Sequence, residues 1–163
     1  MESEILFDPF KSRRQLLLLM MFFWLAYYFI VSLTNLFALL KAAHCLPATW
    51  SFASTNFDEM IRVISRYHFG KSSAVFLLGL ATCAEGLLFL VFLIALFKRK
   101  ARPSLTGVAF LAGTAYWALF IIIDEIFIAY FDESAHVKLL ILSLLSCFLY
   151  FSALSHGEKG GSR

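Results

Sequence analysis

The residues best suited to chemistry are carboxylates that fall inside otherwise apolar stretches of the sequence. Asp124 and Glu125 are adjacent within the segment Gly113–His136. Glu85 lies about 12 residues, or about 18 Å of helix, inside an earlier apolar segment, a depth near the bilayer midplane. Ionisable side chains within a membrane are costly and usually face a bundle interior, a partner or a water-filled cavity. These carboxylates are therefore the first candidates for an intramembrane polar site.

Two other polar residues could join them. An up-and-down bundle of four helices brings the outer halves of its helices together, so Glu85 could meet Asp124 or Glu125. The same arrangement would add His136 and Asn35. Neighbouring residues on a helix point about 100° apart, so Asp124 and Glu125 should face different surroundings.

Carboxylates beside an imidazole suit a first-row metal ion or a proton relay. A metal at Glu85, Glu125 and His136 is the less favoured option, because the paired Glu-x-x-His pattern of di-iron bundles is absent. The favoured interpretation is a buried, neutral Glu85 that forms a hydrogen bond with a neighbour.

Other reactive residue types exclude several functional classes. No pair of histidines falls at the centre of an apolar segment, which argues against a transmembrane haem. The three cysteines form no Cys-x-x-Cys motif, and neither a Gly-x-Ser-x-Gly elbow nor a Gly-rich phosphate loop occurs. We therefore predict no catalytic residue and no cofactor, and an enzymatic role is disfavoured.

The elements that must position these residues are apolar helices. The chain of 163 residues is 61% hydrophobic with a mean hydropathy of +0.80, whereas soluble domains are about half apolar. Four apolar segments, at about 16–40, 74–97, 105–130 and 137–154, are each near or above the length of about 18 residues typical of a span. The sequence predicts an all-α transmembrane four-helix bundle, with residues 1–163 forming a single membrane domain.

The long connection between the first two spans contains an amphipathic helix at about 57–69. Asn56 with Glu59 resembles a capping box, and Gly70 is a natural stop. Apolar residues recur at helical spacing on one face: Phe57, Met60, Ile61, Ile64 and Tyr67. This helix is too short and too charged to span, so it should lie in the outer interface or close over the bundle.

The second span also carries small residues at helical spacing: Gly79, Thr82, Cys83 and Gly86. Small residues on one face of a membrane helix allow a neighbouring backbone to approach closely. We therefore expect this face to be a packing surface.

Basic residues sit at the ends of apolar segments and indicate an orientation. They precede the first span and fill the second connection, from Lys98 to Arg102, whereas the third connection is acidic. The positive-inside rule then places both termini in the cytoplasm, although the first connection carries basic residues of its own. The basic residues form no stripe with interleaved aromatics, so a nucleic-acid partner is not expected.

The layout resembles that of the bacterial predicted small integral membrane proteins of unknown function. The matching positions are Asn35, Asn56 followed by Phe57, Glu85, and the pair Asp124 and Glu125. The second span departs from that pattern because Ala84 precedes Glu85 where a tryptophan is typical. The resemblance implies four spans in a bacterial inner membrane and no particular activity.

The sequence thus leads to two functional hypotheses. The first is a non-catalytic accessory or structural subunit, with membrane lipids and other membrane-protein subunits as partners. The second is a small transporter, or a protein that binds a lipid, a quinone or protons, through carboxylates in a cavity between the second and third spans.

Overall fold

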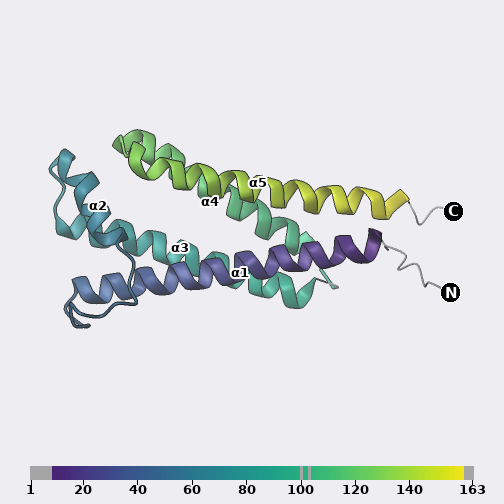
Figure 1. Ribbon diagram of the computed structural model, residues 1–163, viewed down its shortest axis with the longest axis horizontal. Coiled ribbons are helices and arrows are strands. Elements are labelled where there is room, and N and C mark those ends of the chain that lie inside the picture. The colour runs from purple at the N-terminus through teal and green to yellow at the C-terminus, as the bar shows by residue number, and fades with distance from the viewer. Residues whose placement is uncertain (1–8, 100, 103, 160–163) are drawn as a thin grey trace, which may run out of the picture.

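The computed structural model describes residues 9–99, 101–102 and 104–159, and every regular element within them is a helix (Figure 1). Four helices are long and apolar enough to cross a membrane: α1 (Pro9–Ala42), α3 (Lys71–Lys98), α4 (Ser104–Phe127) and α5 (Tyr130–Lys159). The short helix α2 (Asn56–Ile64) and the 3₁₀ turn η1 (Ser65–Tyr67) stand between α1 and α3. The predicted all-α bundle of four candidate spans with a short extra helix is confirmed.

The four long helices are arranged as two pairs. α1 packs along α3 and α4 packs along α5, while contacts between α3 and α4 join the pairs. Figure 1 shows that α1 begins and α5 ends at one end of the bundle. The helix α2 lies at the opposite end, which we call the α2 end. This arrangement brings the first connection over the ends of the spans.

The interior at mid-bundle is built from aromatic rings. Trp24 and Tyr28 of α1 are almost fully buried and stack on each other with ring centroids 5.6 Å apart. Tyr28 also stacks on Phe92 of α3 at 5.8 Å and on Trp117 of α4 at 6.4 Å. The Trp24 indole donates a hydrogen bond to Ser146 of α5 (3.0 Å). These rings therefore bind all four spans together instead of marking a membrane interface.

The helix α2 packs its apolar face against the bundle. Phe57 and Ile64 are buried in a cluster with Ala38, Ala74 and Leu78 of the neighbouring spans. Met60 and Ile61 pack against that cluster. Tyr67 is more exposed, and its ring contacts Phe127 of α4 at 5.4 Å. Of the two placements considered from the sequence, the structure has the helix closed over the bundle.

Both ends of α2 differ from the prediction. The N-cap is Thr55, whose hydroxyl donates to Glu59 Oε1 (2.9 Å), so Asn56 is not the cap. The α-helix ends at Ile64, and the turn that follows stops at His68, which adopts a left-handed conformation with φ of 60°. Histidine is among the non-glycine residues that adopt this conformation most often, and Gly70 remains extended.

The boundary between the third and fourth spans was also predicted wrongly. α4 ends at Phe127 because Ile128 takes a left-handed φ of 51°, and α5 already begins at Tyr130. The backbone N–H of Ala129 donates to the Asp124 carbonyl (2.8 Å) and closes the helix end. The acidic stretch predicted as a connection is thus the start of α5, where negative charge is favourable.

Among the described residues, no other helix packs closely against the two glycines of the small-residue face of α3. A methyl group added at Gly79 or Gly86 would meet no other atom within 4 Å, and Cys83 is exposed. α3 turns the opposite face inward, with Leu78, Glu85 and Phe92 among its buried residues. The expected packing surface is therefore on the outside of the bundle.

Candidate functional site

Glu85 lies inside the bundle with only 4% of its surface exposed. Both of its carboxyl oxygens accept hydrogen bonds from other helices. Asn35 Nδ2 of α1 donates to Oε2 (2.8 Å), and the Tyr116 hydroxyl of α4 donates to Oε1 (2.9 Å). The side chain of Glu85 therefore ties three spans together.

Asn35 extends these contacts to the connection before α2. Its Oδ1 accepts hydrogen bonds from the Ser54 hydroxyl (2.6 Å) and from Asn56 Nδ2 (2.8 Å). The Glu85 network, defined as Asn35, Ser54, Asn56, Glu85 and Tyr116, runs from exposed Asn56 at the α2 end to the buried carboxyl group. It is a continuous set of side-chain hydrogen bonds that joins α1, α2, α3 and α4.

The chemistry that this network can perform follows from its contacts. A polar group buried without partners costs free energy, and a buried carboxyl group is stable when its oxygens are hydrogen-bonded. Here the two donors, Asn35 and Tyr116, occupy both oxygens of Glu85. The geometry fits a device that fixes the positions of helices, and it leaves neither oxygen of Glu85 without a side-chain partner.

Asp124 and His136 form a second polar contact where α4 meets α5. His136 Nδ1 lies 2.5 Å from Asp124 Oδ2, and Asp124 is 5% exposed. The imidazole ring packs against Trp117 (5.8 Å) and Phe120 (4.9 Å). Since the two residues flank the short connection, their contact joins the last turns of α4 to the first turns of α5.

The structure does not gather the predicted residues into one site. Glu85 pairs with Asn35, Asp124 pairs with His136, and exposed Glu125 belongs to neither contact. Within residues 9–99, 101–102 and 104–159, no group of three or more His, Cys, Asp or Glu side chains could hold a metal ion. The combination of Glu85, Glu125 and His136 is thus not assembled.

Three members of the Glu85 network were missed from the sequence: Ser54, Asn56 and Tyr116. Asn56 had been assigned to a helix cap, and Ser54 lies in an irregular connection. Tyr116 could have been identified, because it is the only tyrosine in the candidate span Ser104–Phe127. A tyrosine buried within a span needs a hydrogen-bond partner for its hydroxyl.

The fold and these contacts support a multi-pass membrane protein with four candidate transmembrane helices. Comparison with known proteins finds no matching family model, no matching curated protein and no matching solved structure. The resemblance noted from the sequence remains one of layout, and the functional argument rests on the geometry of this chain.

Proposed function

We propose that this protein is a non-catalytic accessory or structural subunit of a larger membrane complex. One observation carries the proposal: within the described part of the chain, a Cβ added at Gly79 or Gly86 on the small-residue face of α3 would meet no atom within 4 Å, and Cys83 between them is exposed. In lipid, such a face allows the backbone of a second helix to approach closely. A helix from a partner subunit is the occupant that this surface fits.

The use of the intramembrane polar groups also supports this role. Asn35 and Tyr116 both donate hydrogen bonds to Glu85, and Asp124 contacts His136. The hydroxyl groups of Thr114 and Ser143 likewise lie 2.9 Å apart between α4 and α5. These polar groups therefore stabilise the bundle itself.

The alternative function, transport or binding through intramembrane carboxylates, has less support. It requires carboxylates that face a cavity between α3 and α4, whereas Glu85 and Asp124 are buried against side chains. A cavity does lie between these helices, but neither residue lines it.

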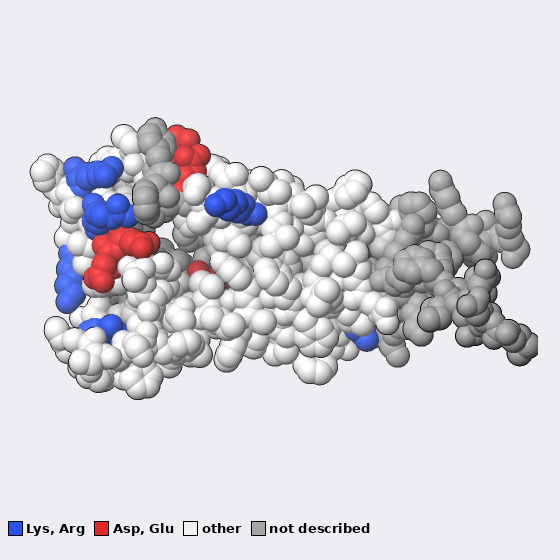
Figure 2. Space-filling model, viewed as in Figure 1, with Lys and Arg blue, Asp and Glu red and all other residues white. Residues whose placement is uncertain are grey.

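We further propose a bacterial inner membrane as the location, with both termini in the cytoplasm. The sequence resemblance supports the location. The orientation is supported by Lys98, Arg99 and Arg102, which lie between α3 and α4 at the end of the bundle opposite α2. At the α2 end, basic and acidic side chains are intermixed (Figure 2).

The test is native mass spectrometry of the protein extracted gently from its own membranes. We expect the wild-type protein to co-purify with at least one other membrane protein. The double variant Gly79→Leu and Gly86→Leu should lose that partner, since the leucines keep its backbone at a distance. Ala115→Leu, a similar enlargement at an exposed position of α4, is the control and should retain it. A wild-type protein that is strictly monomeric and free of partners would contradict the proposal.

A further inference from the structure

The connection between α1 and α2 folds back along the span that it leaves (Figure 1). α1 ends at Ala42, yet the backbone N–H of Ser54 donates to the carbonyl of Thr34 (3.1 Å), eight residues before that end. Eight residues correspond to about 12 Å of helix axis. Since α1 is a candidate span as far as Ala42, the connection returns to the depth of the last turns of that span.

Two exposed rings of this connection pack on α1. Phe37 of α1 contacts Trp50 and Phe52 edge-on, with ring centroids 5.6 and 5.8 Å apart. Trp50 is 40% exposed and Phe52 is 50% exposed. Residues 47–54, which we call the aromatic loop, thus present two rings on the outer surface beside the end of a span.

Hydrogen bonds fix the aromatic loop and use its polar groups internally. The Trp50 backbone N–H donates to the Pro47 carbonyl (3.0 Å), and Lys41 Nζ donates to the Trp50 carbonyl (3.1 Å). The indole N–H, the only polar group of the ring, donates to the Phe52 carbonyl (3.1 Å). The surface that the Trp50 and Phe52 rings expose is therefore hydrocarbon, held in a fixed position.

This apolar surface continues the exposed surface of α1. Ile30 lies seven residues before Phe37, on the same face of the helix, and is 51% exposed. Leu36, next to Phe37, is 43% exposed. Exposed apolar side chains of a membrane span face lipid, and tryptophan is enriched where a span meets the membrane–water interface. The continuity with α1 therefore favours lipid as the partner of the aromatic loop.

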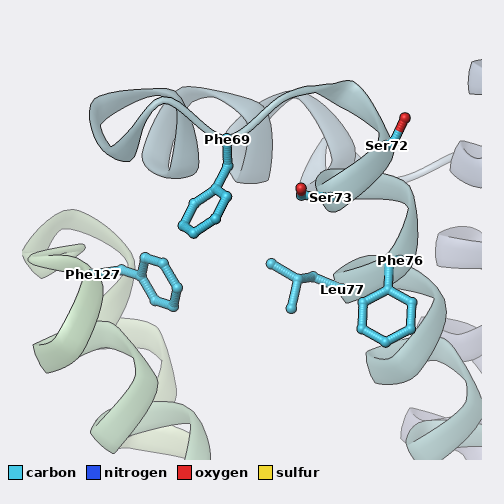
Figure 3. A pocket seen from close by; sticks show the side chains of 6 residues that line it. All are labelled: Phe69, Ser72, Ser73, Phe76, Leu77 and Phe127. Carbon is cyan, nitrogen blue, oxygen red and sulfur yellow. The ribbon is translucent and has the colours of Figure 1, made fainter.

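Aromatic rings are exposed at a similar depth on the side of α3. Phe69 and Phe76, which flank the cavity between α3 and α4 in Figure 3, are 52% and 64% exposed. The Lys71 ammonium group donates to the Ala42 carbonyl (3.0 Å), so the start of α3 lies near the end of α1. Phe76 is five residues, or about 8 Å, inside α3. Phe37 is equally far inside α1. Rings on two sides of the bundle at one depth suit a membrane interface better than a single docking patch.

We propose that the aromatic loop is an interfacial anchor, which inserts Trp50 and Phe52 into the boundary between headgroups and acyl chains of the leaflet at the α2 end. Its partner is the lipid surface itself. The anchor sets how deeply the end of α1 sits in the bilayer. The proposal does not depend on membership of a larger complex, because it concerns the contact of this chain with lipid.

The experiment uses Trp50 as a native fluorescent probe. The other two tryptophans, Trp24 and Trp117, are 1% and 3% exposed within the bundle. The full chain is reconstituted into phosphatidylcholine vesicles that contain lipids brominated near the headgroup (6,7-dibromo) or deeper in the chain (11,12-dibromo). We expect the shallow bromines to quench the wild-type protein more strongly than the deep ones. Trp50→Phe, which keeps a ring against Phe37, should lose most of that difference.

Aqueous iodide, present on both sides of the vesicles, identifies the other environments. Strong quenching of Trp50 by iodide, with no quenching by either brominated lipid, would place the aromatic loop in water and overturn the proposal. Protection of Trp50 from iodide and from both brominated lipids would also overturn it, since a second copy of the chain would then cover the rings.

An added charge tests whether the rings hold the loop in the membrane. Phe52→Glu should reduce quenching by the shallow bromines and shift the Trp50 emission to longer wavelength, because a carboxylate is costly in hydrocarbon. The matched control is Ser65→Glu, at an exposed position three residues after Arg62 on the polar face of the short helix, and it should resemble the wild type. Unchanged quenching in Phe52→Glu would contradict insertion of this ring. The comparison of the wild type with Trp50→Phe decides the proposal even if Phe52→Glu fails to fold.

Discussion

A carboxyl group in the middle of a helix bundle is stable when donors reach its oxygens, and Glu85 meets this condition through Asn35 and Tyr116. Both donors come from other helices, so the stability of the group depends on the tertiary fold. Truncation of Glu85 should therefore cost more than the loss of its own contacts, because Asn35 and Tyr116 would remain buried without their acceptor.

We predict different stabilities for two substitutions of Glu85. Glu85→Ala leaves a void and unpaired donors, and should lower the free energy of unfolding by about 2 to 4 kcal/mol. Glu85→Gln keeps the shape and can still accept the Asn35 hydrogen bond, so its cost should be about 1 kcal/mol. Thermal unfolding in detergent measures both. Equal, unchanged melting of the two variants would show that Glu85 contributes nothing structural.

The sequence identified some of these residues but could not pair them. Glu85, Asn35 and Asp124 were identifiable because polar side chains within apolar spans are costly and usually face the bundle interior or a partner. The helical angle between Asp124 and Glu125 predicted that they would face different surroundings, yet it could not decide which one faces inward. The partners depend on how far each helix is shifted along its neighbour, and a single sequence does not contain that information.

At the scale of elements, span positions were predictable and helix ends were not. A bilayer requires about 18 or more consecutive apolar residues, which a hydropathy pattern reveals directly. Helix ends depend on the conformation of single residues, such as the left-handed His68 and Ile128. Isoleucine is as apolar as the span that it terminates, so hydropathy gave no sign of that break.

Docking of α2 should depend on Asn35, which accepts hydrogen bonds from Ser54 and Asn56. Asn35→Ala removes both acceptor contacts, so backbone amides of α2 should exchange their hydrogens faster. Thr34→Ala is the control, because the Thr34 hydroxyl bonds only within its own helix, to the Val31 carbonyl (3.0 Å). Hydrogen–deuterium exchange over residues 56–67 is the measurement, and unchanged exchange in Asn35→Ala would contradict the role of Asn35 as an anchor.

Packing of α4 against α1 should depend on the absence of a side chain at Gly113. A Cβ added there would lie 3.0 Å from the Tyr28 hydroxyl, and Tyr28 is fully buried. Gly113→Ala should therefore destabilise the bundle by about 1 to 3 kcal/mol through overpacking. Gly86→Ala meets no neighbour and should be neutral or stabilising by up to about 1 kcal/mol. Thermal melting measures both variants. The opposite ranking would show that Gly113 of α4 does not lie close to Tyr28 of α1.

At the scale of the whole molecule, the two ends of the bundle differ in charge. The connection between α3 and α4 contains basic residues and no acidic ones. The α2 end carries both signs, with Arg62 and Lys71 accompanied by Asp58 and Glu59 (Figure 2). The positive-inside rule counts Lys and Arg in short loops, so it favours a cytoplasmic location for the connection between α3 and α4.

The chain offers a native reporter of this orientation in Cys45, which is exposed in the connection before α2. A membrane-impermeant maleimide should label the wild-type protein in intact cells through Cys45, because Cys147 is buried and Cys83 lies in the middle of a candidate span. Cys45→Ser should abolish the labelling. Adding Ala101→Cys to that variant places a thiol at an exposed position between α3 and α4, which should react only after the cells are permeabilised. Labelling of this thiol in intact cells, together with no labelling of Cys45 in the wild-type protein, would reverse the proposed orientation.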